Sequence, residues 1–237
     1  MPDPMIAYCG PAAVPDDLWM RWNFDPLLIA ALAALAIGCG RSCNARAGWS
    51  AIALMVIIFV SPLCALSSAL FSARVFHHVI LVAAVAPLLA LAFPLRSAGS
   101  PPLSALVATH AIILWLWHAP GPYDWGLATV PGYWLMQGSL LGSGWLMWRA
   151  ILVAQRGAAL IALVATVGQM GLLGALIVFA SRPLYAVHFT STSPWGLSPL
   201  ADQQLAGLIM WVPAILPYVG VGLWLAWSSL RPAEPAR

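Results

Sequence analysis

The segment AALIALVATVGQMGLLGALIVFA at residues 158–180 runs for 23 residues without a charged side chain. A helix needs about 20 apolar residues to cross the roughly 30 Å hydrocarbon core of a bilayer, so this segment is long enough to span a membrane. Its apolar run is continuous and does not alternate, which favours a helix over a strand of a membrane barrel. The segment therefore predicts a membrane-spanning helix.

The composition of the whole chain agrees with this prediction. Of 237 residues, 62% are hydrophobic and 7% are charged, and the mean hydropathy is +0.90. Ordinary soluble domains carry about 25% charged residues, so this composition excludes a water-soluble globular protein. The ten basic residues are all arginines dispersed along the chain, with a formal net charge of +3, which excludes a phosphate-binding surface for nucleic acid.

Six further apolar segments resemble the first one, and together they predict an all-α integral membrane protein with seven transmembrane helices. The predicted helices cover residues 26–39, 48–63, 75–95, 103–119, 133–148, 158–180 and 204–228. No linker or internal repeat divides them. We therefore predict an extracytoplasmic segment (residues 1–25), one transmembrane domain (residues 26–229) and a cytoplasmic tail (residues 230–237).

The distribution of arginines predicts the orientation, because short cytoplasmic loops collect basic residues. When successive loops are assigned to opposite sides of the membrane, one side has three arginines and most of the acidic residues, and the other side has seven arginines. The seven are Arg41, Arg46, Arg96, Arg149, Arg156, Arg231 and Arg237. We therefore expect the N-terminus outside and the C-terminus in the cytoplasm, with no cleavable signal peptide in the acidic, proline-rich first 25 residues.

Tryptophan and glycine positions add two expectations about packing. Tryptophan prefers the headgroup interface, so we expect Trp49, Trp145, Trp148 and Trp227 near the inner interface. Glycines in the fifth and sixth helices predict close helix packing. These glycines are Gly142, Gly144, Gly168, Gly171 and Gly174.

Histidines carry the main functional signal. His77 and His78 lie in the first turn of the third predicted helix, His118 ends the fourth, and His188 lies in the loop before the seventh, whereas His110 is about two turns deeper. Imidazole is a common ligand of copper and zinc, so the four outer histidines predict an outer-face metal or haem site. Any one of them taken alone is better explained as an interfacial residue with hydrated nitrogens, and their clustering is what favours a metal site.

Other polar residues fall near the same face. Arg74 shares a helix face with the second histidine of the pair, and Asp124 and Asp202 lie in adjoining outer regions. An ion pair between Arg74 and one of these aspartates is one interpretation, and a role in ligand binding is the other. We expect Asp202 to cap the seventh helix and Gln203 and Gln204 to reach inward.

The four cysteines separate into two groups. Cys39 and Cys43 form a C-x3-C pair at the inner end of the first helix, a spacing that allows two thiolates to hold monovalent copper. Cys9 and Cys64 are assigned to the outer side, where a disulfide and copper ligation both remain open. No nucleophile with its base, phosphate loop or paired carboxylates is visible, so we expect no enzymatic activity.

Four segments of the chain together resemble a known family. They are SPLCALSSALFSARVFHHVIL at 61–81, WLWHAPGPYD at 115–124, RPLY at 182–185 and GLSPLADQQLAGLIMWVP at 196–213. In order and spacing they are similar to the CtaG family of cytochrome c oxidase assembly factors, over about the last three quarters of the chain.

The resemblance implies a seven-helix protein of the bacterial plasma membrane that takes part in the maturation of haem–copper oxidases and helps supply copper to them. The implied partners are the oxidase core subunits and a soluble copper donor, in addition to the lipid bilayer. The implied cofactor is copper, which such a protein would hold or deliver at the outer membrane face.

The family motifs carry over position by position. The third helix of the family begins with a His-x-x-x-His pattern, of which this chain has Arg74 at the first position and His78 at the second. His77 stands where the family commonly has glutamine. His118 of the WHxP motif matches, as do the two following polar residues, Tyr123 and Asp124.

Three hypotheses follow. The first is an oxidase assembly factor that holds copper through His78 and His118, with His77 or His188 as further ligands. Arg74, Tyr123 and the outer aspartates would then support this site.

The second hypothesis is a metal-free scaffold or accessory subunit bound to the oxidase. Arg74 and Gly138 favour it, because both stand at positions where the family has histidine. The third is a small-solute or ion transporter, indicated by a polar line along the fourth helix from His110 outward and by prolines such as Pro87 and Pro213 that break predicted helices.

Overall fold

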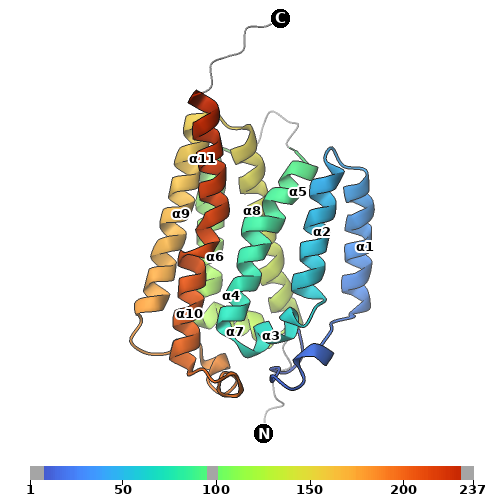
Figure 1. Cartoon of the computed structure of the whole chain (residues 1–237), viewed down its shortest axis with the longest axis vertical. Coiled ribbons are helices and arrows are strands. Elements are labelled where there is room, and N and C mark those ends of the chain that lie inside the picture. Colours follow the sequence, from blue (N-terminus) through green and yellow to red (C-terminus); the bar gives the residue numbers. More distant parts are fainter. Residues whose placement is uncertain (1–7, 95–100, 231–237) are drawn as a thin grey trace, which may run out of the picture.

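The computed structural model describes residues 8–94 and 101–230, and within them every regular element is helical (Figure 1). Successive long helices run antiparallel and form one bundle. Arg96, Arg231 and Arg237, on which part of the predicted orientation depends, lie outside the described residues, as does most of the predicted tail.

Each of the seven predicted segments contains a helix, and two short helices were not predicted. The main helices are α1 (Pro26–Gly40), α2 (Ala45–Phe59), α3 (Leu63–Ala69), α4 (Phe71–Ile80), α5 (Ala86–Ala92), α6 (Leu103–His118), α7 (Pro120–Ala128), α8 (Val130–Val153), α9 (Arg156–Phe179), α10 (Pro199–Trp211) and α11 (Leu216–Leu230). Shorter turns are η1 (Leu18–Met20), η2 (Leu81–Val85), η3 (Ala186–His188), η4 (Ser193–Trp195) and η5 (Pro213–Ile215).

By length and composition, the described helices provide three to five candidate membrane spans, fewer than the seven predicted. Three runs qualify directly: Phe71–Ala92, Arg156–Phe179 and Pro199–Ser228. The bent pairs α2–α3, at 47°, and α6–α7, at 76°, raise the number to five. The helix α1 is apolar but has only 15 residues, and α8, with 24, is not among the apolar candidates.

The third predicted helix continues through a π-helical turn between α4 and α5. In such a turn a carbonyl pairs with the N–H five residues later, but the residue five after Val82 is Pro87, which has no N–H. The indole of Trp148 on α8 donates to the Val82 carbonyl instead, at 3.1 Å. Trp148 is 1% exposed, so its ring packs inside the protein; its predicted depth near the inner membrane interface stays a prediction.

Some of the glycines mark close helix contacts, as predicted, and others do not. A Cβ on Gly174 of α9 would lie 3.1 Å from the Gly207 carbonyl of α10, and one on Gly144 of α8 would lie 3.0 Å from Val82. At Gly142 and Gly168 a Cβ would meet no atom within 4 Å. The helices α9 and α10 therefore pack with their backbones almost in contact, and α10 also packs against α4.

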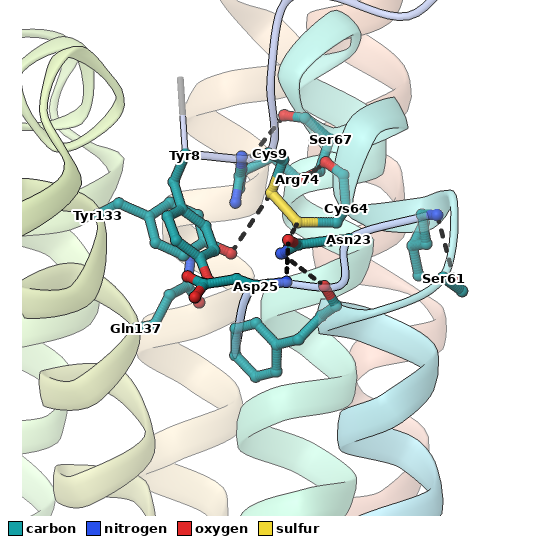
Figure 2. Close-up of a disulfide and its surroundings, with 12 residues drawn as sticks. Tyr8, Cys9, Asn23, Asp25, Ser61, Cys64, Ser67, Arg74, Tyr133 and Gln137 are labelled. Atoms are coloured by element: carbon teal, nitrogen blue, oxygen red, sulfur yellow. Dashed lines mark hydrogen bonds between the residues drawn. A yellow bond between two sulfur atoms is a disulfide. The ribbon is translucent and has the colours of Figure 1, made fainter. Parts of the chain in front are cut away.

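A covalent link holds the N-terminal segment across one end of the bundle. Cys9 is disulfide-bonded to Cys64 at the start of α3, with Cα atoms 5.3 Å apart (Figure 2). The Trp195 indole donates to the Ala13 carbonyl at 3.0 Å, which ties the same segment to the loop between α9 and α10. Of the two alternatives left open for these cysteines, the structure has the disulfide.

Candidate functional site

The predicted histidines gather at the end of the bundle that the N-terminal segment covers. Because α4 begins at Phe71, four residues earlier than predicted, His77 and His78 lie in its second turn. The His78 ring lies 5.7 Å from the ring of His118 at the end of α6, and 5.9 Å from the ring of His77, measured between centroids. All three side chains are buried. We call these three residues the histidine cluster.

Asp202 fixes the position of α4, which carries two of these histidines. Its carboxylate accepts hydrogen bonds from the backbone N–H of Phe71 at 2.7 Å and of Ser72 at 3.2 Å, and from the Ser72 hydroxyl. The first N–H groups of a helix have no partner within it, so Asp202 caps α4 from α10. The prediction that Asp202 caps its own helix is wrong, because Ser198 is the N-cap of α10 and accepts from the Ala201 N–H.

The hydrogen bonds of His118 leave one of its nitrogens with an available lone pair. Its Nδ1 lies 2.7 Å from the Leu114 carbonyl, which only accepts, so Nδ1 carries the proton. In the neutral ring Nε2 is then unprotonated, and no hydrogen bond occupies it within the described residues. The Tyr185 hydroxyl donates to the His118 carbonyl at 2.7 Å and fixes the end of α6.

Gln137 on α8 also contacts the histidine cluster. Its Nε2 lies 3.3 Å from Nε2 of His78, whose Nδ1 has no hydrogen bond in the described part of the chain. Neither ring nitrogen of His77 makes a hydrogen bond of good geometry there, although the Gln137 side chain and the Ile58 backbone lie close to it. Its ring is perpendicular to that of Phe59 at a centroid distance of 4.9 Å. The cluster thus contains unpaired ring nitrogens in a buried environment, an arrangement that buried polar groups rarely keep without a ligand.

His188 has a different environment from the cluster. Its Nε2 accepts from the Tyr123 hydroxyl at 2.7 Å, and its Nδ1 donates to the Ala69 carbonyl at 3.2 Å. Burial, together with the nearby charge of Arg74, lowers the pKa of His188 to about 4, so the ring is neutral at pH 7. Both nitrogens of His188 are used, so this ring has no lone pair to offer a metal. Together with Tyr123 it holds the loop after α9 against α3.

Arg74 is fully buried and forms none of the predicted ion pairs. Its Nε donates to the Ser67 carbonyl at 3.2 Å, and its Cζ lies 5.2 Å from the centroid of the Tyr133 ring. Within the described residues no carboxylate lies within ion-pair distance of its guanidinium. Asp202 caps α4, and the half-buried Asp124 has an oxygen without a hydrogen bond.

The remaining predicted residues have structural contacts or lie elsewhere. Gln203 reaches inward, as expected, and bonds the Leu184 N–H at 2.6 Å and the Ile177 carbonyl at 3.2 Å, whereas Gln204 is half-buried. Cys39 is buried and Cys43 exposed, and neither is disulfide-bonded. Both lie at the end of α1 far from the histidine cluster.

The described residues contain no group of three or more His, Cys, Asp or Glu side chains placed to hold one metal ion. The nearest approach to such a site is the pair His78 and His118. Sequence reasoning missed Gln137, although its spacing of four from Tyr133 places both polar side chains on one face of an otherwise apolar helix.

A family model described as cytochrome c oxidase caa3 assembly factor (Caa3_CtaG) matches residues 45–232. This match covers all the helices that form the site. No curated protein and no solved structure matches the chain.

Proposed function

The chain belongs to the family of cytochrome c oxidase caa3 assembly factors, and from this premise we propose that it is a non-catalytic membrane protein that holds copper for the oxidase at the histidine cluster. Copper is the cargo in this proposal. It would pass to the oxidase by ligand exchange, because neutral imidazoles bind copper and a partner with more ligands removes it. The oxidase is therefore the proposed partner, together with a soluble copper donor.

The observation that carries the proposal is the arrangement of His78 and His118. Their rings are 5.7 Å apart, come from different helices, and are both held by surrounding contacts. The Nε2 lone pair of His118 is available, and His77 adds a third ring at the same place. Two imidazoles supply the kind of ligand that copper accepts, and the oxidase itself could complete the coordination.

We further propose that all seven long helical runs cross the plasma membrane of a bacterium, with the histidine cluster on the outer side. The disulfide between Cys9 and Cys64 supports this orientation, because disulfides persist in oxidising compartments outside the cytoplasm. Cys39 and Cys43, which are not disulfide-bonded, lie at the opposite end. The arginine distribution predicts the same orientation.

The direct test is the copper content of the detergent-purified protein after loading with Cu(I), measured by elemental analysis. We expect about one copper per chain in the disulfide-bonded protein and loss of that copper in the double variant His78→Ala, His118→Ala. The matched control is His110→Ala. His110 is also buried on α6, but its Nδ1 pairs with the Ser143 hydroxyl at 2.9 Å, so we expect copper binding to be retained.

Equal copper in the parent and the double variant would contradict the proposed site. Loss of copper in the His110→Ala control as well would show that general destabilisation, rather than ligand removal, caused the effect. The thermal unfolding temperature of each variant, measured in the same detergent, separates these two causes.

A second candidate function is a metal-free scaffold for the oxidase, and the observation that favours it is Arg74. A buried cation one turn before His78 on α4 repels a copper ion bound there. Under this hypothesis the protein binds no specific copper but still co-purifies with the oxidase. Copper stoichiometry therefore distinguishes the two functions.

A further inference from the structure

The Cys9–Cys64 disulfide lies at the same end of the bundle as the histidine cluster, and Figure 2 shows Arg74, Tyr133 and Gln137 around it. Cys64 is fully buried at the start of α3, whereas Cys9 is half-buried in the N-terminal segment. The sulfur of Cys9 lies 3.7 Å from the hydroxyl of Tyr133, and the Asn23 amide donates to the sulfur of Cys64 at 3.8 Å. The two sulfurs are thus held in a polar environment that a reductant can approach from the side of Cys9.

Arg74 is connected to both cysteines through one residue each. On one side its Nε donates to the carbonyl of Ser67, whose hydroxyl donates to the carbonyl of Cys64 at 2.6 Å. On the other side its guanidinium lies against the ring of Tyr133, whose hydroxyl is the group next to Cys9. Figure 2 shows Arg74 beside the disulfide, between these two contacts.

Within residues 8–94 and 101–230, no carboxylate balances the charge of Arg74. Its side chain is 0% exposed, and neither of its two Nη atoms makes a hydrogen bond of good geometry in the described part of the chain. No carboxylate among those residues pairs with it. A buried cation without a counter-charge is costly, so its environment favours the arrival of one negative charge.

We propose that Cys9 and Cys64, when reduced, form a second site for monovalent copper beside Arg74. Two thiolates and one Cu(I) carry a net charge of −1, which the guanidinium balances, whereas Cu(I) on two neutral imidazoles would add a second positive charge. Thiolate sulfur is also the softer ligand and selects Cu(I). This inference extends the proposed copper-handling function, because it makes the redox state of the cysteine pair decide where copper is held.

The chemistry requires an external dithiol of the thioredoxin-like class. Thiol–disulfide exchange transfers two electrons to the Cys9–Cys64 bond, gives two thiols, and converts the external dithiol to its disulfide. Binding of Cu(I) then displaces the two thiol protons, and the metal keeps its oxidation state. In the reverse exchange, an external disulfide takes the two electrons of the thiolates and becomes a dithiol, with protons supplied by water. The bond between Cys9 and Cys64 re-forms, both thiolate ligands are lost, and Cu(I) is released in the same oxidation state.

The test compares oxidised and reduced protein in a Cys39→Ser, Cys43→Ser background, so that the only thiols come from the pair. Full-length protein in detergent is reduced with dithiothreitol, desalted under nitrogen and loaded with Cu(I) alone. We expect about one additional copper per chain after reduction, with sulfur ligands in the X-ray absorption spectrum. His78→Ala, His118→Ala keeps this additional copper, and Cys9→Ser, Cys64→Ser loses it.

Three results would overturn the inference: equal copper content in the two redox states, additional copper without sulfur ligands, or loss of the folded state on reduction. The proposed function is tested separately by the copper of the oxidised protein, so either proposal can fail while the other stands.

A charge variant supplies a test that leaves the cysteines intact. We expect Arg74→Gln to weaken the Cu(I) affinity of the reduced protein by about tenfold or more, and Arg74→Lys to restore most of it, because only the lysine keeps the positive charge. Competition with a chromogenic Cu(I) chelator measures both. Equal affinities for the parent and Arg74→Gln would contradict the role of the charge.

Discussion

Asp202 illustrates how a single buried carboxylate positions a site that it does not touch. It accepts hydrogen bonds from two backbone N–H groups and one hydroxyl at the start of α4, and the histidines lie one to two turns further along that helix. Sequence reasoning placed Asp202 near the site correctly but assigned it to the wrong helix. The spacing of a capping residue identifies a local partner, whereas this partner is 130 residues away.

We therefore predict that Asp202→Ala lowers the free energy of unfolding by about 2–4 kcal/mol, since it leaves two N–H groups buried without partners. Asp202→Asn keeps one acceptor oxygen and should cost less. Ser198→Ala, at the N-cap of α10, is the control and should cost about 1 kcal/mol. Chemical unfolding in detergent measures all three. An effect of Asp202→Ala no larger than that of the control would contradict the capping role.

His188 predicts a pH dependence of stability. Its folded pKa of about 4 lies below the ordinary value of 6.5, because burial, and then Arg74, disfavour the charged ring. Above pH 6.5 both states are neutral and the contribution of His188 is complete. As the pH falls from 6.5 toward 4, the unfolded chain binds a proton that the folded chain does not, so stability is lost at up to about 1.4 kcal/mol per pH unit.

The variant His188→Gln removes this titrating group. Its unfolding free energy should therefore fall less steeply between pH 6.5 and pH 4 than that of the parent, and the two slopes should be equal above pH 6.5. Unfolding free energies of the two proteins between pH 4 and pH 8 test the expectation. Parallel curves throughout would mean that His188 is not kept neutral by the fold.

The candidate site was predictable from sequence in its residue types but not in its pairings. The histidines, Tyr123 and Asp202 are recognisable because burying a polar group in an apolar protein costs free energy, so such residues are few and have specific roles. Which nitrogen each ring leaves unpaired depends on partners distant in sequence, such as Gln137 for His78, and no local pattern encodes these contacts.

At the scale of helices, α9 and α10 pack closely because glycines at their contact have no side chains. A Cβ on Gly207 would lie 2.6 Å from a methyl carbon of Val178 and 2.7 Å from the Gly174 carbonyl, closer than such atoms can approach. One of these atoms belongs to the backbone, so the helices themselves would have to separate. This contact also holds Asp202, which lies on α10, at the start of α4.

We predict that Gly207→Ala destabilises the protein by about 1–3 kcal/mol or more through overpacking. Gly168→Ala on α9 is the matched control. Its Cβ would meet no atom within 4 Å, and alanine favours a helix over glycine by about 1 kcal/mol, so this change should be neutral or stabilising. The thermal unfolding temperatures of the two variants, measured in the same detergent, test this prediction. Equal effects would show that the close approach does not constrain the helices.

The π-helical turn between α4 and α5 supports a second prediction at this scale. Trp148→Phe keeps an aromatic ring against Tyr218 but leaves the Val82 carbonyl without its indole donor, which should cost about 1–3 kcal/mol. Pro87→Ala returns an N–H to the helix. The cost of Trp148→Phe should therefore be smaller in the Pro87→Ala background, as a double-mutant cycle of unfolding free energies would measure. Additive effects would contradict the compensation.

The positions of the main helices followed from the sequence, but their boundaries did not. Apolar runs locate helices because a buried or membrane-embedded backbone must pair internally. The ends depend on caps and on neighbouring helices: α4 starts at Phe71 because Asp202 meets it there, and the short helices α3 and α7 exist because the chain bends by 47° and 76°. The apolar composition of a segment does not predict where the chain bends.

For the whole molecule, the two ends of the bundle differ in chemistry. The end with the disulfide and the histidine cluster also carries the N-terminal segment, which Trp195 and Cys64 hold in place. The opposite end carries Cys39 and Cys43. If the end with the disulfide faces the oxidising side of the membrane, copper is handled outside the cytoplasm. The proposed function therefore requires this orientation.

Thiol labelling tests this orientation, since Cys43 is exposed while Cys39 is buried and the other two cysteines are in the disulfide. A membrane-impermeant maleimide should label the protein in inside-out vesicles but not in intact cells with a permeabilised outer layer, and Cys43→Ser should abolish the labelling. Ser193→Cys in the Cys43→Ser background is the matched control, because Ser193 is exposed in the loop at the opposite end. It should react from outside the cell. The reverse pattern would place the histidine cluster in the cytoplasm, where a stable disulfide is not expected, and would remove the basis for copper delivery at the outer face.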